Sequence, residues 1–290
     1  MRKVIIEARL NEYAMRDRNP HVPWTANEIA ADARRCVEAG ATVIHFHARR
    51  GDGSPAHDYQ DYRDALVALR SSVDTMIHPT LGVQLSQAEP KMRISHILRL
   101  VEEGLTPDFA PLDMGTSNID HFDIETRRFK TEDRIYFNTT GTLRHFAETL
   151  RAAGVTPFAQ IWNIPHLRQF DAFIQAGYLT APVFFALGLS KGAFLGLHPG
   201  TPAGLRAYFD FFPQGVTMNW TTSMNSGNLL TLIPQIVEAG GNIGIGIGDY
   251  PYPELDFPDN ATLIAEVTRR IRECGAEIAT LPEARRMLGR

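Results

Sequence analysis

The stretch Glu38-Ala39-Gly40-Ala41-Thr42-Val43-Ile44-His45-Phe46-His47 contains the junction on which the predicted fold depends. A helical pattern ends at a small residue and a glycine, and a short run of β-branched and apolar residues begins. Glycine just past a helix takes the left-handed backbone conformation that other residues resist. The same junction recurs at Glu102-Glu103-Gly104, Ala152-Ala153-Gly154, Gln175-Ala176-Gly177, Glu238-Ala239-Gly240 and Glu273-Cys274-Gly275. This repetition predicts that helices and strands alternate along the chain.

Eight short runs have the composition of strands, and most lack the polar alternation of a half-exposed sheet. They lie at residues 3–10, 42–48, 75–78, 108–112, 157–161, 182–187, 216–220 and 242–247. Helices are expected in the gaps, where Thr25-Ala26-Asn27-Glu28 and Thr280-Leu281-Pro282-Glu283 have the pattern of helix starts. Eight such units in 290 residues predict an α/β fold, a single (β/α)8 TIM barrel over residues 1–290 with a C-terminal helix.

The competing fold is an open, doubly wound sheet. It is disfavoured because no Gly-x-Gly-x-x-Gly motif follows the first strand. The glycine-rich run Gly244-Ile245-Gly246-Ile247-Gly248 is followed by Asp249-Tyr250-Pro251 rather than by a helix. We therefore interpret this run as a strand with a close backbone approach, and not as a dinucleotide-binding loop.

Composition excludes several classes of protein. With 44% hydrophobic and 21% charged residues, the chain is neither disordered nor a coiled coil. A net charge of −4 gives no reason to bind nucleic acid or an anionic membrane. The longest apolar stretch, Ala181–Leu189, is too short to span a membrane. Two distant cysteines, Cys36 and Cys274, exclude a disulfide framework and indicate a cytoplasmic protein.

The sharpest local signal is the His45-Phe46-His47 segment at the end of a predicted strand. Side chains two residues apart on a strand share a face, so both imidazoles can bind one divalent ion such as Zn²⁺ at the mouth of the barrel. The alternative is a pair of histidines hydrogen-bonded in a polar barrel core. A third ligand must come from another strand end, where the acidic candidates are Glu7, Glu12, Asp113 and Asp249.

Two further strand ends are rich in glycine and hydroxyl residues. The segment Asp113-Met114-Gly115-Thr116-Ser117-Asn118 follows one strand, and His78-Pro79-Thr80-Leu81-Gly82 spans the end of another. Backbone N–H groups in such loops can bind a carboxylate. A tight turn stabilised by Asp and Asn side chains explains the same pattern.

Longer patterns run through the chain from end to end. They are Asn19-Pro20-x-Val22-Pro23-x-Thr25-x-x-Glu28-Ile29-Ala30, Ala39-Gly40-Ala41-x-Val43-Ile44-His45-x-His47-x-Arg49, Asp52-Gly53-x-Pro55, Gly115-Thr116-x-Asn118, Gly240-Gly241-x-Ile243-x-x-Gly246-x-x-Asp249 and Ala279-Thr280-x-x-Glu283-Ala284-Arg285-x-Met287-Leu288. On these segments the sequence resembles the β-keto acid cleavage enzyme family. The segment with His45 and His47 and the helix before it are the most specific.

The resemblance implies a Zn²⁺-binding (β/α)8 barrel that uses acetyl-CoA as co-substrate. Such an enzyme transfers CoA to the acyl part of a β-keto acid and releases acetoacetate. It further implies that His45 and His47 bind the metal and that Asp249 acts in proton transfer. The residues implied to hold the carboxylate of the keto acid are Thr80 and Thr116, with Gly115 and Asn118 beside the latter. A homo-oligomer, with a tetramer suspected, is also implied.

Three positions depart from the family pattern. Its third metal ligand, a glutamate, corresponds to Gly248, and an arginine implicated in catalysis corresponds to Gly244. A third functional residue of the family is a glutamate after the first strand, which contacts the substrate's amino group in one member. Its position falls near Tyr13 or Ala14.

We expect Glu7 to supply the carboxylate that Gly248 cannot. A lone buried carboxylate in the apolar strand Val4-Ile5-Ile6 would cost several kcal/mol unless it is paired or bound to metal. An ion pair with Arg9 is the alternative, and Glu12 is the competing ligand.

The expected function is therefore a metal-dependent condensation of a β-keto acid with acetyl-CoA, which gives an acyl-CoA and acetoacetate. A metal-dependent aldolase or hydrolase on the same barrel stays open, as does a non-catalytic ligand-binding relative. Dependence on acetyl-CoA distinguishes the condensation from the aldolase, the hydrolase and the non-catalytic protein. The sequence does not specify the acyl group.

Overall fold

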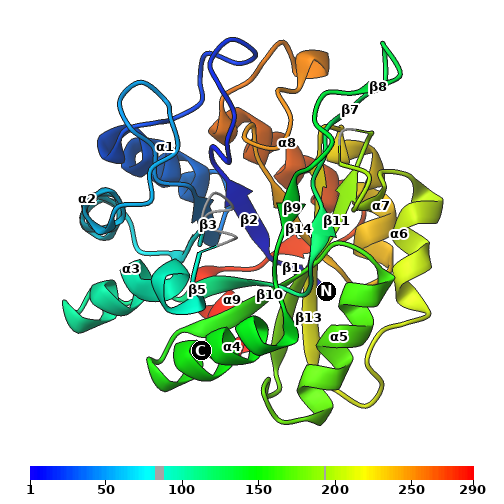
Figure 1. The fold of residues 1–290 in the computed structure, drawn as a ribbon. Helices are drawn as coiled ribbons and strands as arrows, with labels where there is room; N and C mark the ends of the chain where they lie inside the picture. The colour runs from blue at the N-terminus through cyan, green and yellow to red at the C-terminus, as the bar shows by residue number, and fades with distance from the viewer. Residues whose placement is uncertain (82–87, 193) are drawn as a thin grey trace.

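A ring of eight parallel strands lies at the centre of the computed structural model, which describes residues 1–81, 88–192 and 194–290 (Figure 1). The strands are β2 (Ile6–Arg9), β3 (Val43–Phe46), β4 (Met76–Pro79), β5 (Phe109–Asp113), β10 (Thr156–Ile161), β11 (Val183–Ser190), β13 (Met218–Asn225) and β14 (Asn242–Ile245). They are ordered β4-β3-β2-β14-β13-β11-β10-β5. Among these eight strands, those that follow one another along the chain are therefore neighbours in the ring. The predicted α/β barrel and its eight strands are confirmed.

The ring is completed between β4 and β5 at a single residue. The backbone amide of Asp108 donates to the carbonyl of Ile77 at 3.0 Å, and the Asp108 carboxylate accepts from the Ile77 amide at 2.9 Å. These two bonds hold β4 and β5 side by side and so close the ring.

Helices surround the ring and connect most of its strands (Figure 1). They are α1 (Ala26–Glu38), α2 (Tyr59–Ser72), α3 (Pro90–Glu102), α4 (Thr140–Ala152), α5 (Ile164–Gln175), α6 (Pro202–Phe209), α7 (Ile233–Glu238) after the short η2 (Leu229–Leu232), α8 (Asn260–Glu273) and α9 (Leu281–Met287). The predicted capping box forms at Thr25, and the predicted helix start at Thr280 has a capping box as well. The junction glycines have positive φ, as at Gly104 with 75°. Within the described residues, no helix is long and apolar enough to cross a membrane.

Some elements differ from the sequence-based expectation. The run at 3–10 is divided into β1 (Lys3–Val4), which pairs with β15 (Glu277–Ile278), and the barrel strand β2. The insertion between β5 and α4 was not predicted. It contains the paired strands β6 (Ser117–Asn118) and β9 (Ile135–Tyr136) and the projecting hairpin of β7 (Phe122–Asp123) and β8 (Arg128–Phe129). The short strand β12 (His198–Pro199) pairs with β11, and η3 (Pro253–Leu255) precedes α8.

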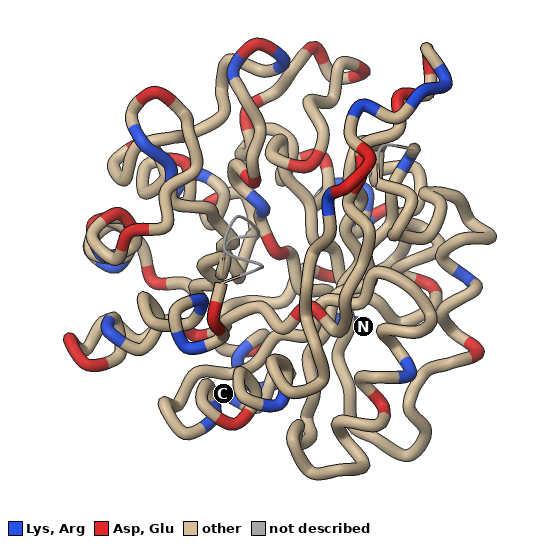
Figure 2. The backbone as a smooth tube through the Cα atoms, viewed as in Figure 1, with Lys and Arg blue, Asp and Glu red and all other residues tan. Residues whose placement is uncertain are grey.

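The barrel interior changes from apolar to polar along the strands. At the end where the strands begin, one buried cluster fills the ring and packs on α9; it includes Ile5, Val43, Met76, Phe109, Phe158, Ala284 and Leu288. Because side chains alternate along a strand, the residues two positions further on share the same inner face. At those positions stand Glu7, His45, His78 and Gln160. Figure 2 shows charged residues on β2 at the centre of the ring, where most other strands are uncharged.

Candidate active site

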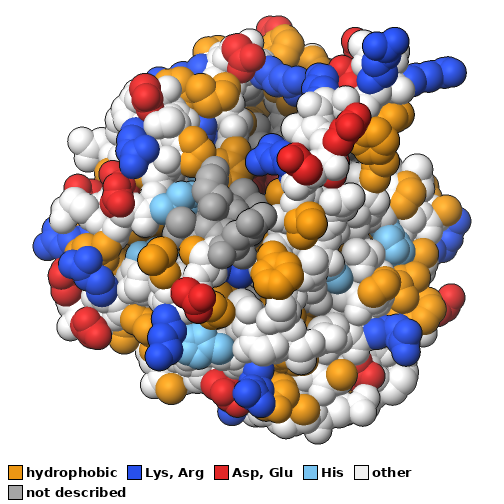
Figure 3. All heavy atoms as spheres, in the orientation of Figure 1, with side chains coloured by type: hydrophobic (Ala, Val, Ile, Leu, Met, Phe, Trp, Pro, Cys, Tyr) orange, Lys and Arg blue, Asp and Glu red, His pale blue; other side chains and the backbone are white. Residues whose placement is uncertain are grey.

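The carboxyl ends of the barrel strands line a cavity of about 660 Å³. Figure 3 shows a hollow in the upper half of one face, bordered by charged side chains. The side chains that reach the cavity from barrel strands or their ends include Arg9, His45, His47, His78, Thr80, Asp113, Gln160, Trp162 and Asp249. This is the face on which barrel enzymes carry their active sites.

Three side chains from two neighbouring strand ends converge in this cavity. Nε2 of His47 lies 2.8 Å from Oε2 of Glu12, and Nε2 of His45 lies 3.2 Å from Oε1. Their ligand atoms all lie within 4.8 Å of one another. Two imidazole nitrogens and one carboxylate oxygen at this spacing form a donor set that suits Zn²⁺. The residues therefore fit the metal that the sequence implied.

The loop after β2 is held so that Glu12 faces the histidines. The amide of Asn11 donates to the carbonyls of Pro23 and His47, and its oxygen accepts from the backbone amide of His47 at 2.9 Å. The carbonyl of Glu12 accepts from the guanidinium of Arg49 at 2.9 Å, and the backbone of Glu12 has a φ of 40°. The left-handed backbone turns the Glu12 side chain back over the strand ends.

Hydrogen bonds and burial prepare the two imidazoles to bind a cation. Nδ1 of His45 donates to the carbonyl of His78 at 2.8 Å, which leaves the lone pair on Nε2 facing Glu12. Burial lowers the pKa of both His45 and His47, so the rings are neutral at neutral pH. Burial opposes ionisation of Glu12, but the charge of Arg9 and the interactions with His47 and His45 together outweigh it, so the pKa of Glu12 lies well below its usual range.

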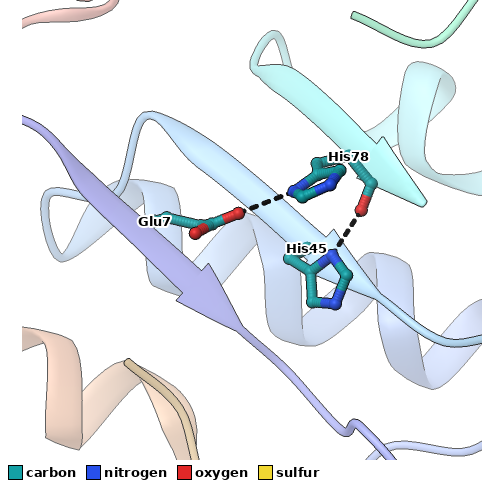
Figure 4. Close-up of side chains that lie close together, drawn as sticks. All are labelled: Glu7, His45 and His78. Carbon is teal, nitrogen blue, oxygen red and sulfur yellow. Dashed lines mark hydrogen bonds and ion pairs between the residues drawn. The ribbon is translucent and has the colours of Figure 1, made fainter. Parts of the chain in front are cut away.

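Glu7 lies one layer deeper in the barrel, as Figure 4 shows. Its Oε1 is 2.8 Å from Nδ1 of His78, and both side chains are completely buried. Glu7, His45 and His78 form a second group of side chains whose ligand atoms lie within 4.8 Å. Burial raises the pKa of Glu7 and lowers that of His78. Glu7 itself does not line the cavity, whereas Glu12 does.

Arg9 links three carboxylates across the site. Its Nε donates to Asp249 at 2.8 Å, its Nη2 lies 2.7 Å from Glu12, and its Nη1 lies 3.9 Å from Glu7. The ion pair of Arg9 with Glu7, which was the alternative to metal binding by Glu7, is thus the longest of the three contacts. Burial raises the pKa of Asp249 to about 7, although Arg9 opposes the shift. A carboxylate with this pKa can accept and release a proton near neutral pH.

Sequence comparison shows the family to which the chain belongs. The sequence model for beta-keto acid cleavage enzyme matches residues 3–289. The chain belongs to the β-keto acid cleavage enzyme family. Members of this family are enzymes that cleave β-keto acids with transfer to acetyl-CoA.

Two relatives show how far this family resemblance extends. The chain is 28% identical to a 3-keto-5-aminohexanoate cleavage enzyme of Fusobacterium nucleatum, over 99% of this chain and 98% of the relative. It is 27% identical to a 3-dehydrocarnitine:acetyl-CoA trimethylamine transferase of Rhizobium meliloti, over 93% of this chain and 91% of that one.

A solved structure with the same fold is ObcA in a ternary complex with a C4-CoA adduct and oxalate. It has a TM-score of 0.69 at 14% identity, over 93% of this chain and 68% of that chain.

Gly244 and Gly248, which correspond by resemblance to functional residues of the β-keto acid cleavage enzymes, lie against β2 and the loop that follows it. A β-carbon on Gly248 would lie 2.5 Å from the carbonyl carbon of Asn11 and 2.6 Å from the nitrogen of Glu12. A β-carbon on Gly244 would lie 3.1 Å from Oε2 of Glu7, 3.2 Å from Oγ1 of Thr221 and 3.5 Å from Cδ of Arg9. The space beside Gly248 is thus occupied by the backbone of Asn11 and Glu12, and the space beside Gly244 is bounded by side chains of β2 and β13.

The residues that the family resemblance assigns to carboxylate binding lie in two different places. Thr80 is buried and lines the cavity. Thr116 and Asn118 are exposed and lie outside the cavity lining, and Thr116 Oγ1 accepts from the backbone amide of Asn138 at 3.0 Å. A β-carbon on Gly115 would lie 2.7 Å from the ring of His166. Their roles stay predictions.

Sequence reasoning missed Arg9 and His78 as members of the site. The signal was present in the strand period, because Glu7 and Arg9 share one face of β2 and His78 pairs in register with His45. It could have been found by following inner-facing positions around the predicted ring.

Proposed function

We propose that the protein condenses a β-keto acid with acetyl-CoA to give an acyl-CoA and acetoacetate. The carboxymethyl carbon of the keto acid leaves its own acyl carbonyl carbon and forms a bond to the acetyl carbonyl carbon, while the CoA sulfur leaves the acetyl carbon and becomes bonded to the remaining acyl group. The observation that carries this proposal is the Glu12–His45–His47 set in the cavity, beside Asp249. It is supported by membership of the β-keto acid cleavage enzyme family and by relatives that are named for acetyl-CoA transfer.

The proposed metal ligands are His45, His47 and Glu12. Bound Zn²⁺ would act as a Lewis acid that stabilises negative charge on the oxygens of the keto acid. Glu7, our sequence-based choice, is the alternative carboxylate. We favour Glu12 because it lines the cavity and its oxygens face both imidazoles, whereas Glu7 faces His78 in the closed interior.

The chain's own residues would then move and place the reacting groups. Asp249, whose pKa burial raises to about 7, takes the proton from the carbon between the two carbonyl groups, holds it on its carboxylate, and returns it to the same carbon when the original carbon–carbon bond breaks. Arg9 fixes the orientation of Asp249 and Glu12 through its hydrogen bonds. We propose that Arg9 replaces the arginine that other family members have at position 244.

Binding of the keto acid's carboxylate is assigned first to Thr80, because it lines the cavity close to His45 and His78 on the neighbouring strand ends. For Thr116, Gly115 and Asn118 the same role rests on the family correspondence alone. A cytoplasmic location and a homo-oligomeric, tetrameric state also stay predictions.

The decisive experiment is a panel of β-keto acids incubated with the Zn²⁺-loaded protein, with and without acetyl-CoA, in which acetoacetate is followed. The proposal expects acetoacetate only when acetyl-CoA is present, and its loss in His45→Ala and His47→Ala. Cleavage at the same rate without a CoA thioester would indicate an aldolase or hydrolase. Bound metal without turnover of any keto acid would indicate a non-catalytic relative.

A further inference from the structure

Asp113 is a carboxylate inside the cavity that the proposed chemistry does not use. It is the last residue of β5, and its oxygens accept hydrogen bonds from the hydroxyl of Tyr136 at 2.7 Å and from the indole nitrogen of Trp162 at 3.1 Å. Both donors are uncharged. Within the described part of the chain, no lysine, arginine or histidine forms an ion pair with Asp113.

The nearby arginines do not neutralise this carboxylate by contact. Arg93 donates to the carbonyl of Phe137 and to the amide oxygen of Asn138, and its guanidinium lies 5.7 Å from the centre of the Tyr136 ring. Burial raises the pKa of Asp113, and the charge of Arg93 only partly opposes this shift. A buried carboxylate that receives only neutral donors is costly unless a further positive charge approaches it.

The walls around Asp113 suit an organic cation. The rings of Tyr136 and Trp162 stack with centroids 5.4 Å apart, and both line the cavity together with Asp113. The hydroxyl edge of Tyr136 and the indole N–H edge of Trp162 point at Asp113, so an ammonium or alkylammonium group in the cavity is attracted by the full negative charge of the carboxylate. Gln160 pairs in register with Asp113 on β10, and among the described residues its buried Nε2 has no hydrogen-bond partner. This nitrogen is free to donate to a carbonyl oxygen of a bound molecule.

We propose that Asp113, Tyr136 and Trp162 form a subsite that selects β-keto acids with a cationic acyl substituent. The inference rests on the proposed function, because it places the keto and carboxylate ends of the substrate near the Glu12–His45–His47 set. Around the ring, β4 separates β3 from β5, so the subsite lies beyond Thr80 as seen from the histidines. One cavity joins the two places. The acyl chain runs from the proposed metal site to Asp113.

The test compares matched β-keto acids of equal length that end in a trimethylammonium, a tert-butyl or a carboxylate group. The wild-type enzyme is expected to prefer the cationic acid over the tert-butyl acid by about tenfold or more in kcat/KM. In Asp113→Asn this preference disappears, mainly through a higher KM for the cationic acid. Tyr136→Phe removes one hydrogen bond but keeps the charge, and so retains the preference. Equal use of the cationic and tert-butyl acids by the wild type, or an unchanged preference in Asp113→Asn, would overturn the proposal.

A binding measurement separates this inference from the proposed function. Fluorescence of Trp162 is followed while 4-(trimethylammonio)butanoate or its isostere 5,5-dimethylhexanoate is added, with Trp162→Phe as the control for the signal. Tighter binding of the cation to the wild type, lost in Asp113→Asn with an unchanged melting temperature, supports the subsite even where no keto acid is cleaved. Equal affinity for both probes contradicts the subsite, even where the condensation is active. If Asp113→Asn fails to fold, the wild-type preference between the two probes decides.

Discussion

The backbone nitrogen of Glu12 lies 2.6 Å from the position that a β-carbon on Gly248 would occupy. Such a contact is too short for any side chain, so residue 248 must be glycine while the loop after β2 follows its present path. The same loop path brings the Glu12 carboxylate to His45 and His47. One loop conformation therefore both requires glycine at position 248 and places the carboxylate that we propose as the metal ligand.

Replacing Gly248 by alanine tests this coupling. The added methyl group must displace Asn11 and Glu12, because the atoms that it would meet are backbone atoms that cannot rotate away. We expect Zn²⁺ affinity to fall by about tenfold or more and the protein to lose roughly 1–3 kcal/mol of stability. Competition with a chromophoric chelator and thermal unfolding measure the two effects. Gly141→Ala in helix α4 is the matched control, because a β-carbon there would lie no closer than 3.8 Å to its nearest neighbour, Oγ1 of Thr139. An equal loss of Zn²⁺ affinity in this variant would contradict the coupling.

Substituting glutamine at Glu12 and at Glu7 decides which carboxylate binds the metal. Each change keeps the shape of the side chain and removes its charge. If Glu12 is the ligand, Glu12→Gln should lower Zn²⁺ affinity by more than about 100-fold, while Glu7→Gln should change it by about tenfold at most. Zinc titration of both variants gives the answer. The reverse order would establish Glu7 as the ligand.

The barrel could be predicted from the sequence because its signals are local. Each helix ends at a glycine junction, and each strand follows as a short apolar run, so the alternation could be counted directly. The insertion between β5 and α4 escaped prediction because its strands are two residues long and carry no period. The long strand β13 was cut short because its second half, from Thr221 to Asn225, is polar and faces the barrel end.

The site was only partly predictable, for a physical reason. His45 and His47 share a strand face, so their pairing follows from spacing alone. The orientation of Glu12 depends on Asn11, whose side chain bonds to His47 from a loop that the sequence pattern does not trace. The argument that a buried Glu7 needs a partner was sound, but the partner in closest contact is His78, two strands away.

The raised pKa of Asp249 predicts a pH-dependent difference between the wild type and Asp249→Asn. Burial raises the pKa of this group from 3.8 to about 7 in the folded chain. Between these values the folded state keeps a proton that the unfolded state has lost, so raising the pH destabilises the wild type. The asparagine variant has no such group. In chelator-treated protein, the stability of the wild type relative to the variant should therefore fall between about pH 4 and 7, by at most about 4 kcal/mol. Urea unfolding at several pH values measures the difference, and a constant difference would contradict the assignment.

Asn260 provides a further test, because it joins the two segments that carry the site. Its amide donates to the carbonyl of Leu10 at 2.9 Å and to Asp32 at 2.7 Å, and its oxygen accepts from the amide of Ile247 at 2.9 Å. Leu10 leads directly to Glu12, and Ile247 leads directly to Gly248. Since Asn260 is completely buried, Asn260→Ala leaves three polar groups without this partner and should cost about 2–4 kcal/mol of stability. Zn²⁺ affinity should fall as well, because both segments lose their common anchor.

Asn242 is the matched control for this prediction. It is equally buried and bonds to the amide of Ile5 and the carbonyl of Trp220, each at 2.9 Å, at the opposite end of β14. Asn242→Ala should therefore cost a similar free energy of unfolding but leave Zn²⁺ affinity unchanged. Thermal unfolding of the metal-free variants and zinc titration at a temperature where both are folded separate the two effects. If both variants bind zinc as the wild type does, Asn260 stabilises the barrel without positioning Glu12. If both lose affinity equally, the effect arises from general destabilisation.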